Sequence, residues 1–280
     1  LVWTMTFGRV QLLAGAMVWF DRWQARRGRR PADRLPVRFG WVLALAYIGI
    51  LSHPLLDFLN TYGIRCLMPF SEQWFYGDVL FIIDVWMWSV LGIAIWLSRR
   101  RERQGRGAVG SPAIIGLLIV AVYCLAMGLG GRAAEHFAAR EIAASSLGTP
   151  KRVLASPVPV DPFRRRIVFE VGDAYGFGDF RWAPDPRFTA EPGLVPTAMD
   201  HPAIARAARQ DKAVADFLYW SRYPFALVRP VAGGTEVVIG DARYNRWPDD
   251  GRFTVRAVVP GTGEVPAAPP KGQAQASPRE

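Results

Sequence analysis

The residues best suited to chemistry are four ionisable side chains in or beside apolar sequence: His53, Asp57, Asp78 and Asp84. His53 and Asp57 are four residues apart, so on a helix they project from the same face. A histidine and a carboxylate in that arrangement can share one metal ion, or the carboxylate can orient the imidazole. The same spacing also fits a simple hydrogen bond at a helix end, with Pro54 kinking the segment.

The two other carboxylates lie in or beside the third apolar stretch. Asp84 falls inside an apolar stretch and Asp78 just precedes it. Ionisable groups inside a membrane span are costly, and their usual roles are functional or paired ones. Asp84 can equally pair with an arginine of another span, such as Arg9. Two ligands on one helix are too few for a catalytic zinc site, which usually has three protein ligands.

Four apolar stretches must position these side chains, and each is long enough to cross about 30 Å of hydrocarbon. They cover residues 1–20, 39–59, 79–98 and 112–131. The chain is 51% hydrophobic and yet carries a net charge of +10. The two properties coexist readily when apolar residues lie in spans and arginines lie in loops. The sequence therefore predicts an α-helical membrane bundle of about four transmembrane helices over residues 1–131.

The basic residues of this half predict its orientation. Twelve of its 14 basic residues lie in two short segments, 22–38 and 99–106, whereas 60–78 holds only Arg65. Positive-inside bias places the two arginine-rich segments in the cytoplasm. The 60–78 loop and the C-terminal domain are then expected in the periplasm or outside the cell, on a multi-pass protein of the bacterial inner membrane. Because the arginines punctuate apolar runs, nucleic acid is not an expected partner, and the lipid bilayer is.

A smaller extramembrane α+β domain is predicted after the spans. Residues 132–155 are expected to form a helical linker, 156–260 the folded domain and 261–280 a disordered tail. Short β-branched and aromatic runs indicate strands. We expect strands within 167–182 and at 225–230, 235–240 and 252–259. A helix is expected from 202 to 220, and a turn at GFGDF (176–180).

The run SHPLLDFLNTYGIRCLMPFSEQWFYGDVLFIIDVW (52–86) resembles the signature of the YdjM-like (LexA-regulated) membrane-bound metal-dependent hydrolase family. The resemblance rests on H-P-x-x-D, an N-x-Y-G turn, a Pro-Phe element, and then Gly-Asp and Ile-Asp. It covers residues 36 to 98. Three further segments are similar to longer members: DPFRRR (161–166), FLYWSRYPF (217–225) and GDARY (240–244).

The resemblance implies a membrane-bound hydrolase acting on phosphoester or lipid-linked substrates at the outer leaflet. It makes His53 and Asp57 ligands of a divalent metal ion, with zinc the expected one, and Asp78 and Asp84 the candidate catalytic or polar partners. The family's N-terminal portion, with its own histidines, has no counterpart before Leu1, so the expectation is a chain lacking upstream ligands. The alternative is a non-enzymatic membrane anchor for a periplasmic binding domain, in which the intramembrane His and Asp residues are structural.

Overall fold

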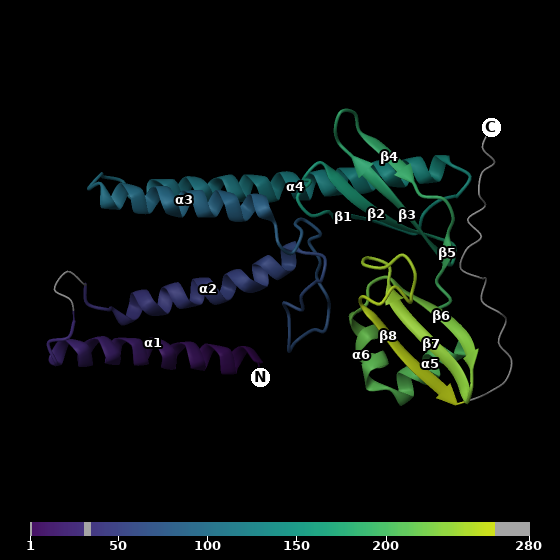
Figure 1. Ribbon diagram of the computed structural model, residues 1–280, viewed down its shortest axis with the longest axis horizontal. Helices are drawn as coiled ribbons and strands as arrows, with labels where there is room; N and C mark the ends of the chain where they lie inside the picture. The colour runs from purple at the N-terminus through teal and green to yellow at the C-terminus, as the bar shows by residue number, and fades with distance from the viewer. Residues whose placement is uncertain (1, 31–34, 261–280) are drawn as a thin grey trace. The chain divides into compact units, whose positions relative to one another are not determined.

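Two compact units divide the chain in the computed structural model, which describes residues 2–30 and 35–260, with backbone alone over 2–7 (Figure 1). The helical unit comprises Leu1–Leu129, and the β-rich unit comprises Gly130–Glu280. A helical region followed by a sheet-rich one is the order that the sequence predicted.

Four long helices make up the helical unit, the last of them continuing into the β-rich unit. They are α1 (Val2–Arg26), α2 (Phe39–Leu59), α3 (Val85–Arg103) and α4 (Ser111–Ala144). Among the described residues, α2 and α4 are the two that are long and apolar enough to cross a membrane. Helix α3 runs on into an arginine-rich end, and α1 carries Asp21 and Arg22 near its end, which lowers the mean hydropathy of both.

The helices of this unit meet through polar contacts, close approaches of small residues and an apolar cluster that includes Met87 of α3 and Met127 of α4. The amide of Gln11 in α1 donates a hydrogen bond to the hydroxyl of Tyr47 in α2, at 3.1 Å. Helices α3 and α4 approach so closely that a Cβ built on Gly116 would lie 2.5 Å from the Cβ of Ala94. Small residues at such crossings let two backbones come together, as is common between membrane helices.

Two predicted boundaries in and after the spans differ from the observed ones. Helix α3 begins at Val85 and not at residue 79, because Asp84 caps its first turn. The predicted linker, 132–155, is α4 as far as Ala144 and already strand from Arg152. The helix continues because Ala134, with neighbouring apolar residues one and two turns on, packs against the first sheet.

The first sheet of the β-rich unit is antiparallel and has the order β1-β2-β3-β4, with β5 paired to β3. Its strands are β1 (Arg152–Pro157), β2 (Arg164–Val171), β3 (Ala174–Arg181), β4 (Arg187–Ala190) and β5 (Val195–Pro196). The last turns of α4 cover one face, where Ala134, Ala138 and Ile142 meet Ile167 and Phe180.

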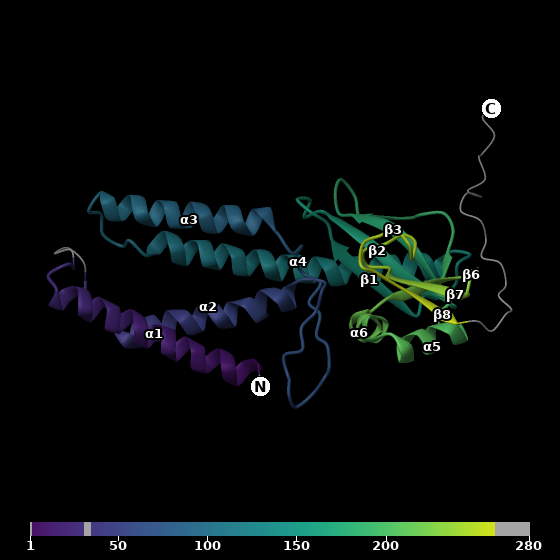
Figure 2. The same ribbon diagram turned by 60° about the horizontal axis from the view of Figure 1, so that its bottom comes forward.

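A second antiparallel sheet, of order β6-β7-β8, packs against two short helices (Figure 2). These elements are α5 (Pro202–Gln210), α6 (Lys212–Trp220), β6 (Pro224–Val231), β7 (Gly234–Asp241) and β8 (Thr254–Pro260). A further buried cluster, which includes Val168, Phe177, Tyr223 and Phe225, joins the two sheets. The unit is therefore a folded α+β body with buried apolar clusters.

Two local predictions in the β-rich unit need correction. The GFGDF segment lies within strand β3 and not in a turn, because Gly176 and Gly178 make room for the rings of Phe169 and Phe188. The single helix expected over 202–220 is two helices, since Asp211 ends α5 and caps α6. The predicted disordered tail, 261–280, lies outside the described residues.

Candidate functional site

The last turns of α2 hold the histidine–aspartate pair that the sequence singled out. His53 Nε2 lies 3.3 Å from Asp57 Oδ2, so the two side chains meet on one helix face as their spacing predicted. The His53 side chain is 80% exposed and that of Asp57 40%. Pro54 lies inside this helix and removes one backbone donor there. Both side chains therefore have the freedom to take a ligand.

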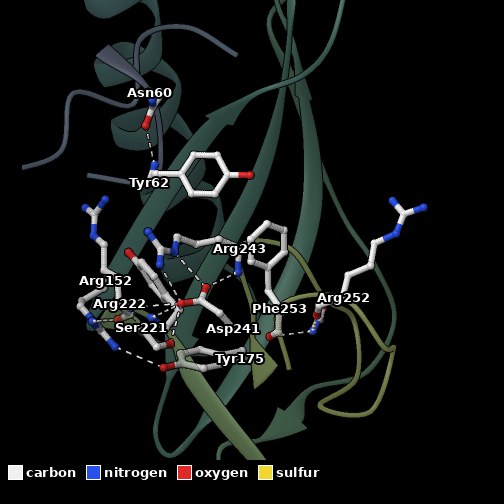
Figure 3. Close-up of polar contacts among 12 residues, drawn as sticks. Asn60, Tyr62, Arg152, Tyr175, Ser221, Arg222, Asp241, Arg243, Arg252 and Phe253 are labelled. Atoms are coloured by element: carbon white, nitrogen blue, oxygen red, sulfur yellow. Dashed lines mark hydrogen bonds and ion pairs between the residues drawn. The ribbon is translucent and has the colours of Figure 1, made fainter. Parts of the chain in front are cut away.

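A loop over residues 60–78 follows the pair and folds back on the end of α2. The side chain of Asn60 accepts a hydrogen bond from the backbone N–H of Tyr62, at 2.7 Å, which closes a tight turn (Figure 3). Gly63 has φ +83°, and a Cβ there would overlap the ring of Tyr76. An isolated antiparallel bridge joins Ile64 to Phe75. The N-x-Y-G element is thus explained by local backbone geometry.

The Gly77–Asp78 element returns the chain to α2. The N–H of Gly77 donates to the carbonyl of Phe58 at 2.7 Å, and those of Val79 and Leu80 both donate to Leu59. These bonds satisfy carbonyls that a helix end would otherwise leave without partners. A Cβ on Gly77 would lie 2.5 Å from the Phe58 oxygen, so only glycine fits.

The two remaining carboxylates differ from the expected intramembrane pair. Asp78 is buried and has φ 54°, a left-handed conformation that aspartate tolerates better than most residues. Asp84 is buried at the N-cap of α3, where its Oδ1 accepts from the N–H groups of Trp86 and Met87 at 3.1 and 2.9 Å. Its Oδ2 accepts from the hydroxyl of Tyr123 in α4, at 2.9 Å. Asp84 thus pins the start of α3 to α4, and its partner is a tyrosine and not Arg9.

The four predicted residues do not form one cluster. In the part of the chain that the structure describes, no group of three His, Cys, Asp or Glu side chains is close enough to hold a metal ion. His53 and Asp57 therefore stand as a pair, with ligand types suited to zinc but fewer than the usual three. Asp84 caps α3, and Asp78 is buried in the segment that returns the chain to α2.

A buried polar network in the β-rich unit was not predicted as a site. The Arg243 guanidinium donates two hydrogen bonds to the Asp241 carboxylate, with Nε–Oδ1 and Nη2–Oδ2 distances of 2.9 Å each (Figure 3). The carboxylate also accepts from the Ser221 hydroxyl at 2.5 Å and from the N–H of Arg222 at 3.1 Å. Both charged side chains are fully buried, so this network is a structural link between FLYWSRYPF (217–225) and GDARY (240–244).

The same network sets the ionisation of its carboxylate. Burial alone would raise the pKa of Asp241, but the hydrogen bonds and charge of Arg243, with the Ser221 hydroxyl, hold the pKa below its ordinary value. Burial also raises the pKa of the neighbouring Tyr175 hydroxyl. The sequence offered one signal for this network, namely a serine, an aspartate and two arginines flanked by apolar residues. Which of these polar residues contact one another depends on the fold.

Comparison with known proteins bears on the helical part of the chain. Residues 7–131 match the family model described as YdjM inner membrane protein. Neither the curated proteins nor the solved structures gave a match. The matched range contains the His53–Asp57 pair, the folded-back loop and the Asp84 cap. The helical region over residues 7–131 is therefore similar to the YdjM inner membrane protein family.

Proposed function

We propose that this protein is a multi-pass inner-membrane hydrolase that uses a divalent metal ion held by His53 and Asp57. Its substrates would be phosphoesters or lipid-linked molecules reached from the outer leaflet. The observation that carries the proposal is the 3.3 Å approach of His53 Nε2 to Asp57 Oδ2 on an accessible helix face. Gly77 closes the loop on α2 and Asp84 caps α3, whereas the side chains of His53 and Asp57 are accessible and contact each other.

The multi-pass arrangement takes α1 and α3 as spans beside α2 and α4. Apolar side chains on α1 and α3 are exposed in the protein, among them Leu12, Trp19, Trp88 and Ile93. Lipid would cover these apolar side chains and remove them from water, which is favourable. The arginines at the ends of these helices favour the cytoplasmic side, which puts the loop over 60–78 and the β-rich unit in the periplasm.

The pair can supply two ligands of the kinds that divalent transition metals accept. A bound zinc ion would lower the pKa of its water to about 7 and polarise a phosphoryl oxygen. His53 would ligate through a ring nitrogen, and Asp57 would ligate or orient the imidazole. Since a catalytic zinc has three protein ligands, the proposal requires at least one ligand from outside this helix.

Metal content tests this proposal directly. The full chain, purified in detergent, should contain zinc or manganese in stoichiometric amount, and His53→Ala and Asp57→Asn should each lose it. Ser52→Ala is the matched control, because Ser52 neighbours the pair on the same exposed turn and bonds only its own helix, to the Gly49 carbonyl. Metal retained in both pair variants, or absent from the native protein, contradicts the proposal. A chromogenic phosphodiester then reports hydrolysis.

A non-enzymatic anchor for the β-rich unit is the second candidate, and the geometry of Asp84 favours it. Both oxygens of that carboxylate are engaged in capping α3 and contacting Tyr123. On this alternative, His53 and Asp57 form a hydrogen-bonded pair that adds about 0.6 kcal/mol to the bundle. His53→Ala would then lower the stability of the helical unit slightly and leave metal content unchanged.

A further inference from the structure

The loop that joins β1 to β2 presents two exposed apolar side chains. Within VPVDPF (158–163), Val160 is 59% exposed and Phe163 61% exposed. Val160 adopts φ 68°, which is unusual for a β-branched residue. The loop is held in shape, since the Asp161 carboxylate accepts from the N–H of Phe163 at 3.0 Å. Two largely exposed apolar side chains therefore lie together on one ordered tip.

Contacts inside the β-rich unit show that this loop lies near Gly130 and Gly131 of α4. Strand β1 runs back along the helix, so that the N–H of Ala155 donates to the Glu135 carboxylate at 3.3 Å. Closer to the loop, a Cβ on Gly131 would lie 3.7 Å from the Arg165 guanidinium. A Cβ on Gly130 would lie 3.6 Å from Trp182 Nε1, and the N–H of Trp182 bonds the Phe163 carbonyl.

The length of α4 indicates where the membrane surface falls on it. The helix has 34 residues, Ser111–Ala144, and its apolar part precedes Gly130. Crossing about 30 Å of hydrocarbon takes about 20 helical residues. A span starting at Ser111 therefore leaves the hydrocarbon close to Gly130 and Gly131. Trp182 lies beside this point, and tryptophan is enriched at membrane interfaces.

Three arginines form a row across neighbouring strands at the same end of the sheet. Arg164 in β2 is directly opposite Arg181 in β3, which is directly opposite Arg187 in β4. Directly opposed residues project from one face, and like charges in such positions destabilise a sheet. Asp179 pairs with Arg164 at 2.9 Å and offsets one of the three charges, so the row still carries net positive charge.

We propose that the β1–β2 loop and this arginine row dock the β-rich unit onto the surface of the bilayer that α4 crosses. Val160 and Phe163 enter the interfacial layer, and the arginines bind the phosphates of anionic lipid headgroups. Guanidinium groups suit that role because their planar fork contacts phosphate with two parallel hydrogen bonds. The motif DPFRRR (161–166) thereby gains a function independent of metal chemistry, although the proposal rests on α4 spanning the membrane.

Spin labels at two loop tips test the docking in the full chain. Phe163→Cys and, as the matched control, Asp173→Cys are placed on a Cys66→Ser, Cys124→Ser background in phosphatidylcholine vesicles containing phosphatidylglycerol. Asp173 is in the β2–β3 turn at the opposite end of β2, and its side chain is 84% exposed. If the cysteine-free background is unstable, Cys124 can be retained, since it is partly buried in α4.

For each label, the measurement is the ratio of its collision rate with oxygen to its collision rate with a water-soluble nickel chelate. This ratio should be several-fold higher for the label at 163 than for the label at 173. Equal ratios at the two sites would overturn the docking. Removing phosphatidylglycerol, or combining Arg181→Gln with Arg187→Gln, should lower this collision ratio for the label at 163, as expected if the label becomes more exposed to water. The control pair Arg209→Gln and Arg256→Gln removes the same charge from exposed positions elsewhere in the unit. An equal shift with the control pair, or none with the row pair, would overturn the role of the arginine row.

Discussion

The two units of this chain satisfy their apolar residues in different ways. In α2, no side chain is buried although the helix is strongly apolar. In the β-rich unit, residues such as Leu154, Val168 and Phe225 are fully buried. The helical unit relies on lipid to cover its surface, whereas the β-rich unit builds its own core. Substitutions should therefore act through different mechanisms in the two units.

The largest effect is expected at the buried pair of the β-rich unit. Asp241→Asn leaves the Arg243 guanidinium buried without its counter-charge, which should cost about 3–5 kcal/mol of unfolding free energy. Limited proteolysis in increasing urea measures the loss, with fragments assigned to each unit. The control is Asp173→Asn at an exposed position, which should change little. Equal stability of the Asp241 variant and the native chain would show that the network is not a structural link.

Acid should weaken the same unit through the same carboxylate. The pKa of Asp241 is lower in the folded state than the unfolded value of about 3.9, so ionisation stabilises the fold at neutral pH. That contribution is complete above the unfolded pKa and is lost as the pH falls toward the folded one. Unfolding measured between pH 6 and about pH 3 should show a steeper decline for the native chain than for Asp241→Asn. Parallel curves would contradict the assignment.

The next effect tests whether the helical unit also depends on tight packing at one place. Gly77→Ala places a Cβ 2.5 Å from the Phe58 oxygen and should cost about 1–3 kcal/mol. Thermal unfolding in detergent is the measurement. Gly92→Ala is the control, because nothing lies within 4 Å of its Cβ and alanine favours the helix. A Gly77 variant as stable as the control would mean that the loop closure contributes nothing.

A smaller effect is expected from the Asp84 cap. Asp84→Ala should cost about 1 kcal/mol for the lost cap, and Tyr123→Phe about 0.6 kcal/mol. The double variant should cost less than the sum, because the two side chains contact each other. The double-mutant cycle in detergent reports the coupling. Strictly additive losses would argue against the contact between α3 and α4.

The smallest effect on stability is expected at the proposed metal pair. His53 is so exposed that His53→Ala should change the stability of the metal-free helical unit by less than about 0.5 kcal/mol. Chelator-treated protein in detergent provides the comparison. A larger loss would favour the structural role of the pair over the metal site.

The motif residues are of two kinds, those whose contacts follow from helical periodicity and those whose contacts depend on where helices begin and end. The His53–Asp57 contact followed from helical periodicity alone, since four residues make about one turn. The roles of Gly77 and Asp84 did not, because both depend on where α2 ends and α3 begins. A carboxylate inside an apolar run has the same sequence signature whether it is buried in a span or caps a helix.

The sequence alone determined the order of the two units, the extent of α2 and the approximate positions of the strands of the second sheet, because periodicity and turn residues are local properties. Tertiary structure decided what periodicity cannot encode. It packed the end of α4 on the first sheet, joined Asp241 at the end of β7 to Ser221 at the end of α6, and aligned Arg164, Arg181 and Arg187 on one face. Each of these depends on register or packing between segments far apart in the chain, whose energies no local pattern contains.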